Sequence, residues 1–87
     1  MRIKYHREFI KYYKKRIAHS PKLVAQFQKQ LRKFINNPKD LVLKDHKLTG
    51  QRDGYRSFSI TGDIRVVYKI VGDNIWFYNI GSHNQVY

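Results

Sequence analysis

A chain of 87 residues suffices for one domain, so we expect a single unit over residues 1–87, with a modest core and an exposed groove rather than a deep cavity. Cysteine is absent, which excludes a disulfide framework and a thiolate zinc site. The 18 Lys and Arg against 6 Asp and Glu give a formal net charge of +12, which attracts phosphate backbones, anionic membrane surfaces or acidic proteins.

Two helices are predicted to follow a short strand. Residues 1–5 alternate apolar and polar side chains, as a strand does, and residues 7–19 repeat apolar side chains at helical spacing. Ser20 is typical of a helix N-cap and Pro21 of the first helical position, so a second helix is expected there, ending before Pro38. Its apolar side chains are Leu23, Val24, Phe27, Leu31, Phe34 and Ile35.

The predicted helices carry most of the positive charge. Residues 1–44 contain 13 basic and 2 acidic residues, a net charge of +11, whereas residues 45–87 contain 5 and 4, a net charge of +1. This charge fits either a solvated outer surface or a surface that binds a partner.

A sheet is predicted for the second half, after a loop at residues 39–53. The predicted strands are residues 54–61, 64–71 and 75–80. In the middle strand Ile64, Val66, Tyr68 and Ile70 share one face. The sequence therefore predicts an α+β fold of order β-α-α-β-β-β, with both helices on one face of a small antiparallel sheet and the opposite face, bearing Arg65, left open.

Targeting segments are not evident. The N-terminus lacks the apolar stretch of a signal peptide, and the longest later apolar run, residues 75–78, is too short to span a bilayer. We expect a cytoplasmic protein without a membrane partner.

Three residues have the chemistry that metal-free RNA cleavage requires. The reaction needs a base for the 2′-OH, an acid for the leaving 5′-oxygen and a cation for the charge that builds on phosphorus. His46, His83 and Arg65 are of these types, and the hairpin order places Arg65 and His83 near the same sheet end. Each also has a plainer interpretation: His46 as a solvated loop residue, His83 as a strand-end residue, and Arg65 as a solubilising charge.

Further candidates have alternatives as well. Asp63 either closes a turn or orients an imidazole, and Tyr87 either is disordered, as chain ends often are, or stacks on an unpaired base. Trp76, Phe77 and Tyr78 are expected in core and sheet packing rather than in an RNA platform. Because the six acidic residues are scattered singly, we expect no metal and no cofactor.

Three segments in a fixed order carry a resemblance to a known family. They are Lys44-Asp45-His46-Lys47-Leu48-Thr49-Gly50, then Gly54-Tyr55-Arg56 with Asp63 and Val66-Val67-Tyr68-Lys69, and finally Gly81-Ser82-His83 leading to an aromatic residue. Over nearly its whole length the chain resembles the RelE superfamily of bacterial toxins, specifically the YafQ-like mRNA interferases of type II toxin-antitoxin pairs.

The resemblance implies a function and a set of residue roles. Such toxins cut mRNA in the ribosomal decoding site without a metal, and an antitoxin, here expected to be acidic, neutralises them. By resemblance His46 matches a catalytic histidine, Asp63 an active-site aspartate, and His83 the general acid. Tyr87 matches a C-terminal aromatic residue that contacts the substrate, and Arg65 matches an arginine that holds the scissile phosphate in other branches.

Two positions depart from the family pattern. Ser59 and Ile64 stand where the branch commonly has a histidine and a tryptophan. Because serine does not titrate near neutral pH, any task of the missing imidazole falls to another group. Three hypotheses follow: an endoribonuclease toxin, a non-catalytic module that binds RNA or ribosomes, and a toxin homologue that has lost activity.

Overall fold

The fold combines helices and a mixed sheet, and the computed structural model describes residues 2–87. The elements are β1 (Arg2–Tyr5), α1 (Arg7–Arg16), α2 (Pro21–Asn36), β2 (His46–Lys47), β3 (Arg56–Ser59), β4 (Ile64–Val71), β5 (Asn74–Ser82) and α3 (His83–Val86). Two 3₁₀ turns, η1 (Leu41–Leu43) and η2 (Gly50–Arg52), lie in the segment expected to be a loop. The predicted α+β class and the main element order are confirmed, with β2 and α3 as additions.

The strands form one sheet of order β1-β5-β4-β3-β2. Neighbouring strands from β3 to β5 are antiparallel, as predicted, and the added β2 is antiparallel to β3, but β1 pairs with β5 in parallel. The prediction of a wholly antiparallel sheet is therefore wrong for β1. Alternation along a strand indicates burial of one face and carries no information on the direction of the partner strand, which here is set by the crossover through α1 and α2.

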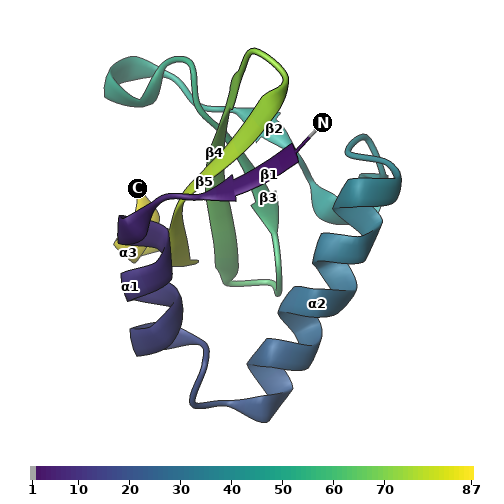
Figure 1. The fold of residues 1–87 in the computed structure, drawn as a ribbon, viewed down its shortest axis with the longest axis vertical. Helices are drawn as coiled ribbons and strands as arrows, with labels where there is room; N and C mark the ends of the chain where they lie inside the picture. The colour runs from purple at the N-terminus through teal and green to yellow at the C-terminus, as the bar shows by residue number, and fades with distance from the viewer. Residues whose placement is uncertain (1) are drawn as a thin grey trace.

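The helix ends follow local capping. Ser20 accepts a hydrogen bond from the Leu23 N–H at 3.3 Å, so α2 begins where the sequence predicted. Helix α1 ends at Arg16, three residues before the predicted end, because the N–H groups of Ile17 and Ala18 both donate to the Tyr13 carbonyl. Figure 1 shows α1 and α2 joined at the bottom of the view and spreading apart toward the sheet. Within residues 2–87 no helix is long and apolar enough to cross a membrane.

An aromatic core lies between the two long helices and the sheet, as predicted. Phe34 of α2 stacks on Phe58 of β3 with ring centroids 4.4 Å apart, and Phe9 of α1 meets Phe77 of β5 edge-on at 5.5 Å. In β4 the predicted inner stripe is buried at Val66 and Tyr68, but Ile70 is exposed.

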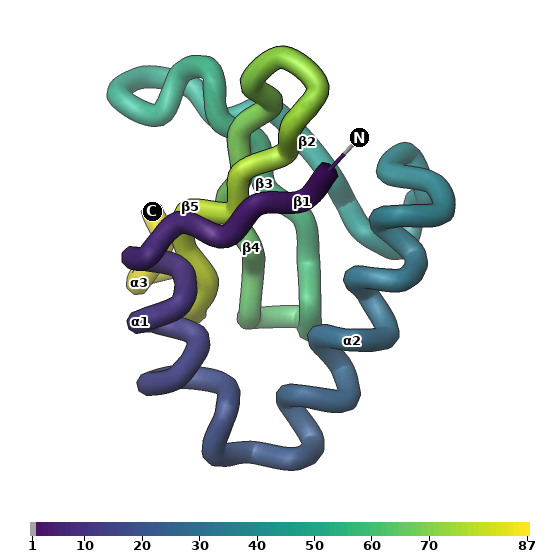
Figure 2. The backbone as a smooth tube through the Cα atoms, in the orientation of Figure 1, coloured from purple at the N-terminus to yellow at the C-terminus, as the bar shows by residue number. Residues whose placement is uncertain are grey.

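The opposite face of the sheet is partly covered, which corrects the prediction that it stays open. Val67 of β4 is only 2% exposed because it packs with Leu48 and Val86, and Tyr55 lies against this second cluster. Figure 2 shows α3, at the C-terminus, folded back beside the sheet rather than extending away from it. The covering is thus made by α3 and by the segment after β2.

A bulge interrupts the pairing of β4 with β5. Val67 pairs with Asn79 and Tyr68 with Phe77, so Tyr78 has no partner. The extra residue shifts the alternation of β5, and Tyr78 and Asn79 both border a hollow that also contains Val67. Tyr78 is half-buried and packs against Tyr55 and Trp76 on the sheet, whereas Phe77 is fully buried in the core, so the expected core and sheet packing divides between the two rings.

Candidate active site

A groove of about 410 Å³ lies where β2, the loop after it and α3 meet. Its lining residues are His46, Lys47, Leu48, Thr49, Arg52, His83 and Tyr87. Three of the five predicted site residues therefore share one groove: His46, His83 and Tyr87. The two histidines are 37 positions apart in sequence, so the fold brings them together. Leu48 gives this groove an apolar floor and packs with the buried Val86 beneath it.

His46 is held in one orientation at the groove. It lies in β2 opposite Ser57, and its Nδ1 lies 3.0 Å from the Lys44 carbonyl oxygen. Because a carbonyl only accepts, Nδ1 carries the proton in the neutral ring, and the lone pair is left on Nε2. Lys44 has a left-handed backbone with φ of 50°, an uncommon conformation for a side chain of this size. The backbone thus selects the tautomer in which Nε2 can act as a base.

Asp45, directly before His46, anchors the segment to the sheet. Its carboxylate accepts from Arg56 Nε at 2.8 Å, lies 2.7 Å from Arg56 Nη2, and accepts a hydrogen bond from the Tyr68 hydroxyl. The Asp45 side chain is only 7% exposed. Burial, and then the hydrogen bond to this carboxylate, raise the pKa of Tyr68 well above its usual value, so this hydroxyl stays a donor. The backbone that leads into His46 is therefore fixed by two strands.

The short helix α3 places His83 and Tyr87 on the groove. Val86 is fully buried, and the Gln85 side chain accepts a hydrogen bond from the Ser82 N–H at 2.8 Å. The two rings meet edge-on with centroids 4.5 Å apart. The Tyr87 hydroxyl donates to Ser57 Oγ, so this residue is ordered rather than disordered. His83 directly follows β5, as expected of a strand-end residue, and it begins a helix that was not predicted.

Arg65 and Asp63 lie outside the groove lining. Arg65 pairs with Ser59 on one side and Gly81 on the other, on the same sheet face as Val67. Its Nη1 is buried and makes no hydrogen bond to any residue between 2 and 87. Asp63 is exposed in the β3–β4 turn, where its N–H donates to Thr61 Oγ1 at 3.2 Å. The structure thus keeps Arg65 on the groove's face and gives Asp63 a turn-closing contact.

The two positions that depart from the family pattern lie beside this region. Ser59 is 6% exposed and Ile64 is half-buried. In Ser59 the backbone carbonyl accepts a hydrogen bond from the Gln30 side chain at 3.0 Å, which ties β3 to α2.

Comparison with known proteins decides the family. The sequence model of the family described as "Bacterial toxin of type II toxin-antitoxin system, YafQ" matches residues 1–87. The chain belongs to the YafQ toxin family. The YafQ-like resemblance inferred from the sequence is thereby confirmed, and with it the assignment as a toxin component.

Solved structures agree with this family. YafQ from Escherichia coli strain BL21(DE3) superposes with a TM-score of 0.78 at 26% identity, covering 100% of this chain and 99% of that chain. A chain of the E. coli DinJ-YafQ complex gives 0.75 at 26% identity, with coverage of 100% and 99%. The RelBE2 toxin-antitoxin complex of Mycobacterium tuberculosis gives 0.71 at 14% identity, with coverage of 94% and 96%, and shows the fold alone. Among curated protein sequences, none matches this chain.

Several groove residues of this YafQ-family chain were not predicted. Ser57 holds Tyr87, and Lys47 and Arg52 add two cations to the groove. The alternation of Ser57 and Ser59 with apolar neighbours indicates a polar strand face, which was a usable sign for Ser57. Arg52 had no such sign, because its place depends on how the segment after β2 folds.

The surrounding charge is almost entirely unpaired. Among residues 2–87 the one ion pair is Arg56 with Asp45. No three His, Asp or Glu side chains in this range gather as ligands for a metal ion. The groove therefore lies in a strongly positive field suited to a phosphate backbone.

Proposed function

We propose that this YafQ-family toxin is an endoribonuclease that cleaves mRNA on the ribosome without a metal. The observation that carries the proposal is that His46 and His83 line one groove together with Tyr87. Two imidazoles that line one groove can divide the base and acid roles near neutral pH.

The chemistry follows from the orientation of His46. Its Nε2 takes the proton from the 2′-OH, and O2′ attacks phosphorus as the bond from phosphorus to O5′ breaks. Protonated His83 donates its proton to the leaving O5′. The products are a 2′,3′-cyclic phosphate and a 5′-hydroxyl, and the two histidines exchange their protonation states in the process.

The remaining predicted residues bind the scissile phosphate, stack on a base of the RNA, or orient a catalytic group. Arg65 holds the scissile phosphate from the sheet face that bears the groove, which would give its buried, unpartnered Nη1 or the rest of its guanidinium a ligand. Tyr87 stacks on a base of the substrate, with its ring held by Ser57. Asp63 retains the orienting role implied by the family, exerted from the turn that leads into β4.

The ribosome holds the mRNA in the orientation that the open groove alone does not impose. A shallow site orients a flexible RNA poorly, and a ribosome that already holds the mRNA provides that orientation. The basic helices then bind ribosomal RNA, with a net charge of +11 over residues 1–44.

A protein partner is also part of the proposal. The E. coli relative is described in a complex with DinJ, and the mycobacterial neighbour in a toxin-antitoxin complex. We propose an acidic antitoxin that forms a hetero-oligomer with this chain in the cytoplasm and neutralises it.

The test is cleavage of an mRNA translated by purified ribosomes, with the cut positions mapped. Wild type is expected to cut, and His46→Ala and His83→Ala are expected to lose at least about 100-fold in rate, as general acid-base groups do. His19→Ala is the matched control, because His19 is exposed between α1 and α2 and is not a groove residue. Cleavage is expected to persist in EDTA.

Other results would support different functions. An intact message with retained, steeply salt-dependent ribosome binding would indicate a non-catalytic RNA-binding module. An intact message, no growth arrest on expression, and retained antitoxin binding would indicate an inactive homologue. Loss of cleavage in EDTA would overturn the metal-free assignment alone.

A further inference from the structure

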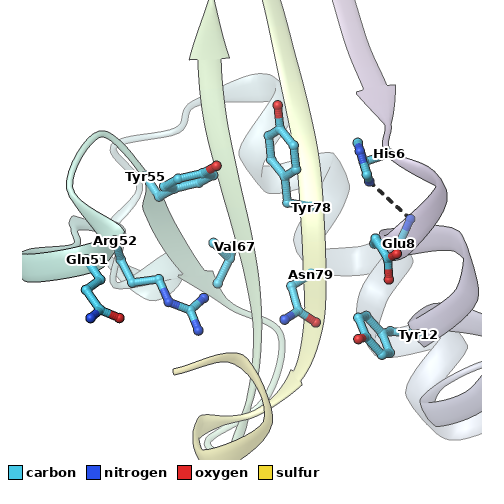
Figure 3. Close-up of a pocket in the computed structure, with 9 residues that line it drawn as sticks. All are labelled: His6, Glu8, Tyr12, Gln51, Arg52, Tyr55, Val67, Tyr78 and Asn79. Carbon is cyan, nitrogen blue, oxygen red and sulfur yellow. Dashed lines mark hydrogen bonds between the residues drawn. The ribbon is translucent and has the colours of Figure 1, made fainter.

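A second hollow of about 440 Å³ lies on the same sheet face as the catalytic groove. The two share Arg52, and their floors belong to one apolar cluster, since Val67 lines the hollow and Leu48 lines the groove. Figure 3 shows Tyr55 and Tyr78 on one side of Val67, and Arg52 beneath them. An RNA strand that occupies the groove can therefore continue into the hollow by passing the Arg52 side chain.

Aromatic rings line this hollow and remain accessible. Tyr55 meets Tyr78 edge-on with centroids 5.4 Å apart, and His6 lies 5.1 Å from Tyr78. All three residues are half-buried, and Lys69 Nζ lies 5.2 Å from the centroid of the Tyr55 ring, where a cation also suits a site for RNA. Tyr78 follows the buried Phe77, so alternation along β5 turns its ring to the opposite sheet face, and the bulge leaves it without a ladder partner. Aromatic faces presented in this way are typical of sites that stack unpaired bases.

The polar groups of the hollow suit a base better than a phosphate. Asn79 Oδ1 accepts from Arg16 Nη1 at 3.2 Å, so the Asn79 amide nitrogen is left as a donor. Figure 3 shows that nitrogen turned away from α1. Glu8 adds a carboxylate, which repels phosphate and accepts hydrogen bonds from base N–H groups. Donor, acceptor and stacking rings together match the edge and face of a nucleobase.

We propose that this hollow is a subsite for a nucleobase of the mRNA that flanks the cleaved linkage, with Arg52 on the phosphate between the hollow and the groove. The inference rests on the proposed function, because it takes the groove as the place of cleavage. Tyr55 and Tyr78 provide the stacking surface, and Glu8 and Asn79 read the base edge. The hollow therefore contributes to the sequence preference of the toxin.

The test measures binding of RNA that cannot be cut. A labelled hexanucleotide with 2′-O-methyl groups lacks the attacking hydroxyl, and its affinity is measured by fluorescence anisotropy at low salt. A single abasic residue is then moved through the six positions. For wild type we expect one position outside the groove at which the abasic residue weakens binding at least about 5-fold, the lower limit for loss of one stacked base.

Variants of the hollow's tyrosines test whether the RNA base at that position binds in the hollow. In Tyr78→Ala the abasic penalty is expected to vanish at that position, whereas Tyr78→Phe keeps the ring and the penalty. Tyr5→Ala is the matched control, because Tyr5 is 43% exposed but lies against Phe9 and Phe77, away from the hollow. If thermal unfolding shows that Tyr78→Ala does not fold, Tyr55→Ala replaces it.

Two results would overturn the subsite. One is an abasic penalty of equal size in wild type and Tyr78→Ala, and the other is no binding of the hexanucleotide at low salt. Both are independent of cleavage, because the probe lacks the 2′-OH. Failure of the subsite is thus distinguishable from an uncut message, which would refute the proposed endoribonuclease instead.

Discussion

Replacing Asp45 with alanine tests how the segment that carries His46 is held. The substitution leaves the Tyr68 hydroxyl buried without an acceptor, in a residue only 2% exposed, at a cost of about 1 to 3 kcal/mol. Arg56 is 33% exposed, so water replaces much of its lost contact and adds only about 0 to 1 kcal/mol. We therefore expect Asp45→Ala to lower the free energy of unfolding by about 1 to 4 kcal/mol.

The assay is urea unfolding followed by circular dichroism. Asp73→Ala removes the same charge from an exposed turn and is expected to stay within about 0.5 kcal/mol of wild type. Adding Tyr68→Phe to Asp45→Ala removes the orphaned hydroxyl and is expected to recover part of the loss. Cleavage should fall in Asp45→Ala because His46 follows it directly.

The reasoning fails if Asp45→Ala costs no more than Asp73→Ala. It also fails if Tyr68→Phe destabilises the Asp45→Ala background as much as it destabilises wild type, because the hydroxyl would then gain nothing from Asp45.

Three further predictions concern the groove and its support. Ser57→Ala removes the partner of the Tyr87 hydroxyl, so we expect a loss of about 0.5 to 1.5 kcal/mol in urea unfolding together with slower cleavage; unchanged cleavage would show that the ring needs no tether. A Cβ at Gly81 would lie 2.6 Å from Gln85 Oε1, so Gly81→Ala is expected to displace α3 and reduce cleavage while the circular dichroism spectrum stays folded. The pKa of Tyr68 is raised by burial and by its hydrogen bond, so the unfolded chain loses that proton near pH 10 while the folded chain keeps it. The stability that this difference gives is fully present below pH 10, and the free energy of unfolding falls by about 1.4 kcal/mol per pH unit above it. The measurement is urea unfolding between pH 10 and 11.5. A Tyr68→Phe variant whose free energy of unfolding falls equally steeply with pH would contradict this assignment.

The sequence predicted those parts of the fold that depend on local patterns. Ser20 with Pro21 marked the start of α2, and period-two alternation marked β4 and most of β5. It did not predict β2, because two residues are too short to show alternation. Nor did it predict α3, whose four residues depend on burial of Val86 against a distant strand.

The residue types of the site were predictable from the sequence, but their arrangement in space was not. The histidines and Tyr87 were chosen by residue type and family pattern, and their common groove depends on α3 folding back, which local sequence does not specify. The cluster of Asp45 with Tyr68 joins residues 23 positions apart, so no spacing rule finds it. Tyr78 was expected in core or sheet packing because no RNA-binding motif surrounds it, and the bulge that leaves it without a ladder partner has no sign in the local sequence.

The position of β5 in the sheet has a consequence for synthesis. It is the last strand to be made, yet it lies between the first strand and β4. While residues 74–82 are still inside the exit tunnel of the ribosome, β1 has no neighbour and the aromatic core lacks Phe77. A nascent chain therefore cannot complete the sheet, or dock the helix after it that bears His83, until this segment has left the tunnel. For the proposed ribosome-dependent endoribonuclease, the groove that contains His83 is therefore incomplete while the chain is still being made.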